Sequence, residues 1–219
     1  MQRQALKFLS VQRWKTLAQI QSGVPVSIET RALGTLAYIR SSIELSGSMV
    51  VPGMAGVVMG SIGILAAIAA STPRWASHGL AIWVVAGGIA FVVGGALMAR
   101  QAAQSGHARY LGPVRKFLLC LCPALLAGAV LTFVLWHAHL ESLLAGTWLL
   151  LYGCAVLSAS TVTIAGTMRL LCIMGALFVV LGSLAFALPA AGHTAVLGLG
   201  FGVLHIVFGL LVGRLDHAE

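Results

Sequence analysis

Charge is what this sequence has least of. Only 8% of its 219 residues are Asp, Glu, Lys or Arg, whereas 59% are hydrophobic. Soluble domains carry roughly 25% charged residues, and so few charges cannot cover the surface of a water-soluble fold. The composition therefore excludes an ordinary soluble domain and predicts an all-α polytopic protein whose solvent is a lipid bilayer.

Catalytic motifs are also missing. The sequence has no HExxH, no GxSxG, no Walker lysine motif and no pair of carboxylates within an apolar segment. Ser142, Thr147 and Tyr152 have no neighbouring base in the sequence that would activate them. The four cysteines all fall in apolar segments, where cysteine packs as a small hydrophobe. These absences favour a non-enzymatic protein.

The 13 Lys and Arg residues exceed the 5 acidic ones, for a net charge of +8. They do not form a dense patch interleaved with aromatic residues, so the basic excess does not indicate binding to nucleic acid. Their spacing instead marks membrane spans. Uncharged windows of 29, 25, 24, 27 and 44 residues lie between Glu44 and Arg214. A membrane helix needs about 20 residues, so the first four windows hold one span each.

The 44-residue window is long enough for two spans, and the Pro and Gly of "ALPAAGH" at 187–193 predict the turn between them. The sequence thus predicts six transmembrane helices in one bundle. We expect a membrane domain over 46–214 and a short cytoplasmic tail over 215–219. The predicted spans are 47–71, 77–99, 117–138, 143–160, 164–187 and 194–213.

The positive-inside rule orients these spans. Twelve of the 13 Lys and Arg residues fall on one side of the predicted topology, and only Arg74 falls on the other. Both chain ends are therefore expected in the cytoplasm of a bacterial cell, with the spans in the inner membrane. Arg115 and Lys116, in the loop after the second span, are predicted to contact anionic lipid headgroups.

Residues 1–45 carry six of the basic residues but no continuous apolar run. They are expected to form a basic amphipathic cytoplasmic helix on the membrane surface, and an ordinary cytoplasmic tail is the open alternative.

Glycines are expected to pack the bundle, because helices in lipid gain no hydrophobic advantage from contact and approach closely through small residues. The first span carries four glycines within about 80° of one face. In the last span four glycines and a histidine share a stripe of similar width. These two sets are Gly53, Gly56, Gly60 and Gly63, and Gly198, Gly202, His205, Gly209 and Gly213.

His205 lies in the middle of an apolar span, and three interpretations stay open. It is a neutral structural residue bonded across to Ser61 or Tyr152. It is the ligand of a haem or other tetrapyrrole, with Gly202 and Gly209 giving the macrocycle room. Or it is the polar centre of a proton or substrate path. No second histidine lies at matching depth, which excludes a bis-histidine haem.

Four further histidines map to the outer ends of the spans: His78, His137, His139 and His193. With Glu141 they would suit a first-row metal if the helix ends met in space. An interfacial belt of histidine and tryptophan is the alternative.

Four blocks resemble a family of small bacterial multi-span inner-membrane proteins to which no activity is attached. They are "YIRSSIELSGSMVVPGMAGVVMG", "GPVRKFLLCLCPALLAGAVLT", "LAGTWLLLYGCAV" and "GFGVLHIVFGLLVGR", within residues 38–214. The resemblance implies an inner-membrane location and no catalytic residue.

The function expected from these features is that of a membrane binding, scaffold or regulatory subunit. Its glycine faces would pack internally or against another subunit or a second copy. A small-molecule or proton-linked transporter or channel centred on His205 is the first alternative, and a tetrapyrrole-holding subunit the second. Spans one and six share glycine spacing, whereas an inverted repeat of three spans would pair one with four, so the sequence does not favour a transporter repeat.

Overall fold

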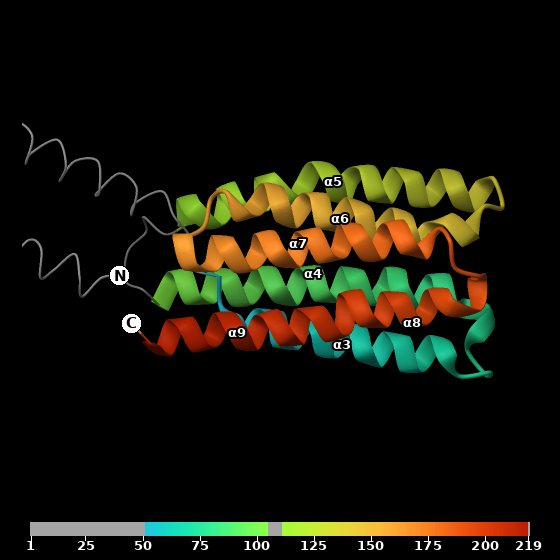
Figure 1. The fold of residues 1–219 in the computed structure, drawn as a ribbon, viewed down its shortest axis with the longest axis horizontal. Helices are drawn as coiled ribbons and strands as arrows, with labels where there is room; N and C mark the ends of the chain where they lie inside the picture. The colour runs from blue at the N-terminus through green and yellow to red at the C-terminus, as the bar shows by residue number, and fades with distance from the viewer. Residues whose placement is uncertain (1–50, 105–110, 219) are drawn as a thin grey trace, which may run out of the picture. The chain divides into compact units, whose positions relative to one another are not determined.

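The computed structural model describes residues 51–104 and 111–218 and is helical over most of them, with no strand in those ranges. Six stretches are long and apolar enough to cross a membrane, so the predicted number of spans is confirmed. The expected N-terminal helix over 1–45 lies outside the described residues. Figure 1 shows the six helical crossings lying side by side.

The first five crossings are single α-helices. They are α3 (Gly53–Ser71), α4 (Gly79–Gln104), α5 (Leu111–His137), α6 (Leu144–Ser160) and α7 (Ala165–Ala185). Single turns of 3₁₀ helix precede α4, α6 and α8: η1 (Ala76–His78), η3 (Glu141–Leu143) and η4 (Ala190–Gly192). The predicted turn at 187–193 is confirmed, because the chain leaves α7 at Ala185 and starts its return at η4.

The sixth crossing is not one regular helix. It begins with α8 (His193–Leu197), passes through seven residues of π-helix, η5 (Gly198–Leu204), and continues as α9 (His205–Ala218). The segment "GLGFGVL" contains three glycines, and wide i→i+5 turns of this kind interrupt α-helices mostly at functional sites. His205 is the first residue after it.

Two groups of three helices account for most of the packing. In the first triad, α3 packs against both α4 and the sixth crossing. In the second triad, α6 packs against both α5 and α7. The triads meet more sparsely, through α4 with α5 and through α8 and η5 with α6 and α7.

Glycines bring α3 into backbone contact with the sixth crossing. The sequence predicted that these glycine faces pack either internally or against another subunit, and the contacts are internal. A Cβ on Gly60 would lie 2.6 Å from the carbonyl oxygen of Gly202, and one on Gly56 would lie 2.9 Å from the Cα of Gly209. Gly53 and Gly63 likewise face the backbone of the sixth crossing. The two glycine faces therefore pack internally against each other.

A second glycine contact, which the sequence analysis missed, joins α6 to α7. A Cβ on Gly153 would lie 2.8 Å from the carbonyl oxygen of Gly175, and one on Gly182 would lie 2.7 Å from the backbone nitrogen of Leu150. Gly146 and Gly153 are seven residues apart, as are Gly175 and Gly182. This common spacing keeps each pair on one helix face.

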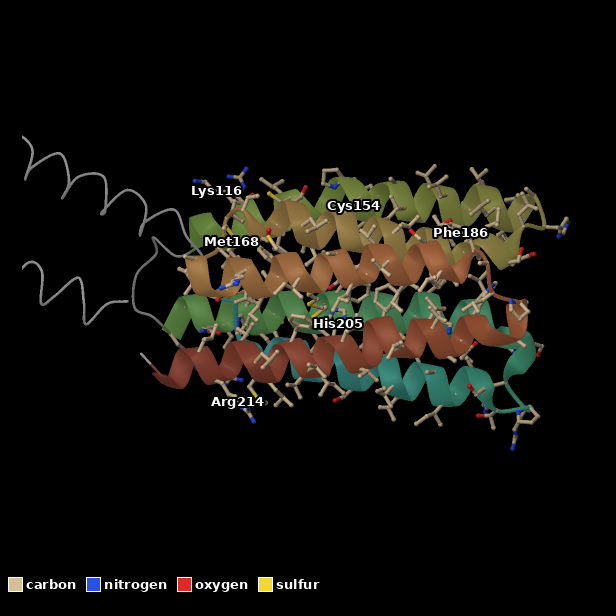
Figure 2. The ribbon with its side chains drawn as sticks, viewed as in Figure 1. Lys116, Cys154, Met168, Phe186, His205 and Arg214 are labelled. Carbon is tan, nitrogen blue, oxygen red and sulfur yellow. The ribbon has the colours of Figure 1, made fainter. Side chains whose placement is uncertain are left out.

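Basic residues gather at one end of the helices in the described part of the chain. Arg100 lies near the end of α4, Arg115 and Lys116 near the start of α5, and Arg169 near the start of α7. Figure 2 shows Lys116 and Arg214 at the same end. Arg74, between α3 and α4, lies at the opposite end.

We predict that Gly209→Ala destabilises the fold by about 1–3 kcal/mol, the usual cost of overpacking. Its added methyl would lie 2.7 Å from the backbone of Gly53 and Val57, which cannot move aside as a side chain would. Thermal unfolding in detergent measures the change. Gly88→Ala on α4 is the control, because a Cβ there meets nothing within 4 Å. Equal unfolding temperatures for the two variants would contradict the packing.

Candidate functional site

His205 is buried at the centre of the described helices, with 4% of its surface exposed. Figure 2 shows it midway along the crossings, so the expectation that its ring does not face lipid is confirmed. A buried imidazole needs partners for both ring nitrogens. The π-helical turns bring one partner close, because the Nδ1 atom lies 3.4 Å from the carbonyl oxygen of Gly200, five residues earlier.

The second partner is Tyr152 of α6, one of the two candidates predicted from the sequence. Its hydroxyl oxygen lies 2.7 Å from the Nε2 atom of His205. A carbonyl oxygen only accepts hydrogen bonds, so Nδ1 carries the proton and donates to Gly200. Nε2 then holds the lone pair, and the Tyr152 hydroxyl donates to it. Both side chains are neutral in this arrangement.

The other predicted partner, Ser61, does not reach His205. Its hydroxyl donates to the carbonyl oxygen of Val57 in its own helix, at 2.9 Å. Serine side chains within helices commonly donate to the carbonyl oxygen four residues earlier in this way.

Four rings surround the hydrogen bond and form what we call the aromatic cluster: Tyr152, Phe178, Phe201 and His205. Ring centroids of Tyr152 lie 4.9 Å from Phe178 and 5.2 Å from Phe201, and Phe178 lies 5.4 Å from His205. The rings come from α6, α7, η5 and α9, so the cluster fills the contact between the two triads. Phe178 is fully buried.

The helical wheel was wrong about the direction in which His205 projects. It placed the ring on the glycine stripe, but Gly202 and Gly209 face α3 whereas the ring contacts α6 and α7. The wheel assumed 100° per residue, and the π-helical turns of η5 advance by less. Gly200 was not predicted to pack between helices, but it faces the side chains of Leu149 and Phe178 in the second triad.

The space that a tetrapyrrole would need is filled in this arrangement. A Cβ on Gly202 would lie 2.5 Å from Ile64, and one on Gly209 would lie 2.7 Å from the Gly53 carbonyl oxygen. The Nε2 atom of His205 is engaged by Tyr152. Neither the glycine stripe nor the Nε2 atom of His205 is therefore free for a macrocycle in this arrangement.

The outer histidines do not come together as a metal site within the described residues. His139 and Glu141 approach to 3.9 Å, but both are exposed. His78 bonds Ser77, His193 lies 3.1 Å from the carbonyl oxygen of Leu188, and the His137 ring packs on Phe133 and Trp136. The condition for a shared metal site, that the helix ends meet, is not fulfilled among the described residues, where each of these histidines contacts only its own segment.

Sequence reasoning also missed one polar contact and one buried indole that lacks a polar partner. The Trp148 indole donates to the hydroxyl of Thr132, at 2.8 Å, and joins α6 to α5. Trp83 of α4 is 8% exposed, lies 6.3 Å from the Phe201 ring, and has no partner for its indole nitrogen among the described residues. No spacing signal existed for either, because the Trp148–Thr132 bond and the Trp83–Phe201 ring contact each join different helices.

Chemically, the pair offers one hydrogen-bond donor and one acceptor, each already satisfied. Glu141, the one acidic residue between Val51 and Leu215, lies in η3 just before α6 and is exposed. No carboxylate within the described crossings is therefore available to activate a nucleophile or to hold a cation. If this neutral hydrogen bond breaks, the Tyr152 hydroxyl becomes available as a donor and the His205 Nε2 atom as an acceptor for another molecule.

No family model, curated protein or solved structure matches this chain.

We predict that Tyr152→Phe lowers the free energy of unfolding by about 1 kcal/mol, since hydrogen bonds between membrane helices contribute about 0.6 kcal/mol and up to about 1.7. A double-mutant cycle with His205→Phe, measured by unfolding in mixed micelles, isolates the interaction. Thr132→Val is the control, because it breaks a bond within the second triad. Strict additivity of Tyr152→Phe and His205→Phe would contradict the bond.

Proposed function

We propose that this protein is a non-enzymatic transporter or channel of the bacterial inner membrane, which passes a small molecule or a proton through a centre at Tyr152 and His205. The observation that carries the proposal is the hydrogen bond from Tyr152 to His205. It joins two triads that are each held by closer packing than the contact between them. Intramembrane ionisable residues with a polar partner commonly mark a path.

The proposed orientation follows from the charged residues. Five of the six Lys and Arg residues in the described part of the chain lie at one end of the crossings, and the positive-inside rule assigns that end to the cytoplasm. Both chain ends are then cytoplasmic. Arg115 and Lys116 are exposed there, which suits contact with anionic headgroups.

The helix contacts support a transporter repeat, which the glycine spacing in the sequence did not favour. The first and fourth crossings, α3 and α6, each lie between two helices of their own triad. They run in opposite directions, and each contacts its successor, α4 or α7. If α3, α4 and α5 form one half of a repeat, and α6, α7 and the sixth crossing form the other, the third helix of each half packs on the opposite half. Thus α5 packs on α6, and the sixth crossing packs on α3. Inverted repeats of three spans with an interrupted helix at their midplane are a transporter architecture.

We interpret the described arrangement as the closed state of the proposed path. His205 and Phe178 have almost no exposed surface, whereas Tyr152 and Phe201 are partly buried. Opening would require the triads to part at the cluster while the glycine contacts within each triad hold. The Tyr152 hydrogen bond would be broken in that step, which makes it a latch between closed and open states.

We predict that Tyr152→Phe makes the centre accessible to water. The reporter is Val156→Cys, a buried α6 position one turn from Tyr152, in a protein whose native cysteines are replaced by alanine. A membrane-impermeant maleimide added to either side of oriented vesicles should label it slowly in the parent and roughly fivefold faster in Tyr152→Phe, the effect of removing a bond of about 1 kcal/mol.

Thr132→Val in the same background controls for general loosening and should leave the labelling rate unchanged. Absence of labelling from both sides, in the parent and in Tyr152→Phe, would show a closed core and overturn the transport proposal.

A second candidate is a subunit that binds another membrane protein, and one observation favours it. Gly88 and Gly95 of α4 are seven residues apart, and a Cβ on either would meet nothing within 4 Å. The glycines of α3 and the sixth crossing, which the scaffold hypothesis first used, are occupied internally. The exposed face of α4 is the remaining small-residue surface for close helix contact.

For this candidate we predict that Gly88→Leu with Gly95→Leu removes a co-purifying membrane subunit without lowering the unfolding temperature. Affinity purification in mild detergent measures it. Ala127→Leu, at an exposed position of α5, is the control. Retention of every co-purifying protein by the double variant would remove α4 as the binding face.

A further inference from the structure

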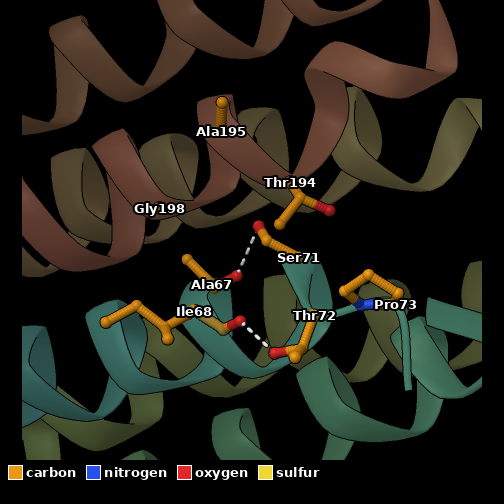
Figure 3. A pocket seen from close by; sticks show the side chains of 8 residues that line it. All are labelled: Ala67, Ile68, Ser71, Thr72, Pro73, Thr194, Ala195 and Gly198. Atoms are coloured by element: carbon orange, nitrogen blue, oxygen red, sulfur yellow. Dashed lines mark hydrogen bonds between the residues drawn. The ribbon is translucent and has the colours of Figure 1, made fainter. Parts of the chain in front are cut away.

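A groove of about 500 Å³ lies between the end of α3 and the start of α8. Figure 3 shows its lining side chains, which come from the last turns of α3, the residues that follow, and the first turns of the sixth crossing. Ala67, Ile68 and Gly198 line the part nearer the membrane centre. The two elements come together at its inner end, where a Cβ on Gly198 would lie 2.9 Å from that of Ala67, so the groove is a hollow over the surface of these small residues.

The groove changes character along its length. Its outer part is lined by the hydroxyl-bearing Ser71, Thr72 and Thr194. Ser71 donates to the carbonyl oxygen of Ala67 at 2.8 Å, and Thr72 donates to that of Ile68 at 2.9 Å. Their oxygens keep lone pairs that can accept. An apolar inner part with a polar mouth matches the boundary between hydrocarbon and headgroups.

Arg74 is the next residue in the chain after the groove lining ends at Pro73. A backbone hydrogen bond from Trp75 to Thr72 of 2.9 Å closes the turn that holds it. Its side chain is exposed. Arg74 is the one Lys or Arg at the outer end in the described part of the chain, and topology does not require a cation there. A guanidinium recognises a phosphate by paired hydrogen bonds.

We propose that this groove is a binding site for a phospholipid of the outer leaflet, with one acyl chain along Ala67 and Gly198 and the phosphate at Arg74. A free phosphate ion would leave the apolar part empty, whereas a lipid fills both parts. The proposal rests on the membrane assignment and the orientation, and it does not require transport. Gly198 is the first residue of the π-helical segment that precedes His205, so the bound chain would lie against that segment.

The test uses the full chain in vesicles that contain a phospholipid with a photoactivatable group in its acyl chain. After illumination, crosslinked peptides are mapped by mass spectrometry. We expect crosslinks at 67–72 and 194–198 to exceed those on the exposed face of α5, around Leu126 and Val130, at the same lipid concentration. Equal yields at the two places would show ordinary lipid contact and overturn the site.

Two variants separate the parts of the site. Ala195→Trp fills the groove and should abolish the excess, with Ala127→Trp on α5 as the matched control. Arg74→Gln should lower it roughly fivefold, the contribution expected of one cation near a lipid surface, with Arg100→Gln at the opposite end as control. If neither groove variant changes the yield, the proposal is wrong.

A lipid probe tests the headgroup without any substitution. A diacylglycerol with the same photoactivatable chain lacks the phosphate and should crosslink as weakly in the native protein as the phospholipid does in Arg74→Gln. Equal crosslinking of both lipids would overturn the role of Arg74. Failure of this site would leave the labelling of Val156→Cys unaffected, so the two proposals fail separately.

Discussion

Direct backbone contact between α3 and the sixth crossing is the constraint on which the rest of the arrangement depends. Lipid supplies no hydrophobic force between helices, so their association requires close packing. Gly53, Gly60 and Gly209 allow an approach at which any Cβ would overlap backbone atoms. This contact sets the rotation of the sixth crossing about its axis. Its opposite face, with Phe201 and His205, is thereby turned toward α6 and α7.

The π-helical segment reconciles two demands on that one crossing. Gly202 and Gly209 must face α3, while His205 between them must turn its ring to the second triad. A regular α-helix puts all three on one stripe. Wider turns change the phase, and the cost of weaker backbone bonding is offset in part because the imidazole Nδ1 donates to the Gly200 carbonyl oxygen. The glycines of "GLGFG" allow both the wide turns and the close contact with α3.

The number of spans and the turn at 187–193 were predictable because they depend on charge and apolar length, which are local properties. The partner of His205 was half predictable: matching depth selected Tyr152 and Ser61, but only the rotation of each helix decides between them. The α6–α7 glycine contact was missed because the two contacting glycines of each helix form no conspicuous stripe until both helices are seen together. The metal site could not be decided from the sequence for a related reason, since similar depth does not say which helix ends are neighbours, and the described histidines do not gather.

The aromatic cluster lies where the two triads meet, and the contacts there are sparser than the contacts within each triad. In each triad, glycines hold one pair of helices in backbone contact that tolerates little displacement: α3 with the sixth crossing, and α6 with α7. Between the triads lie rings and one neutral hydrogen bond, which can part without leaving a buried charge. A rigid body on either side of a weak contact is what a two-state element requires.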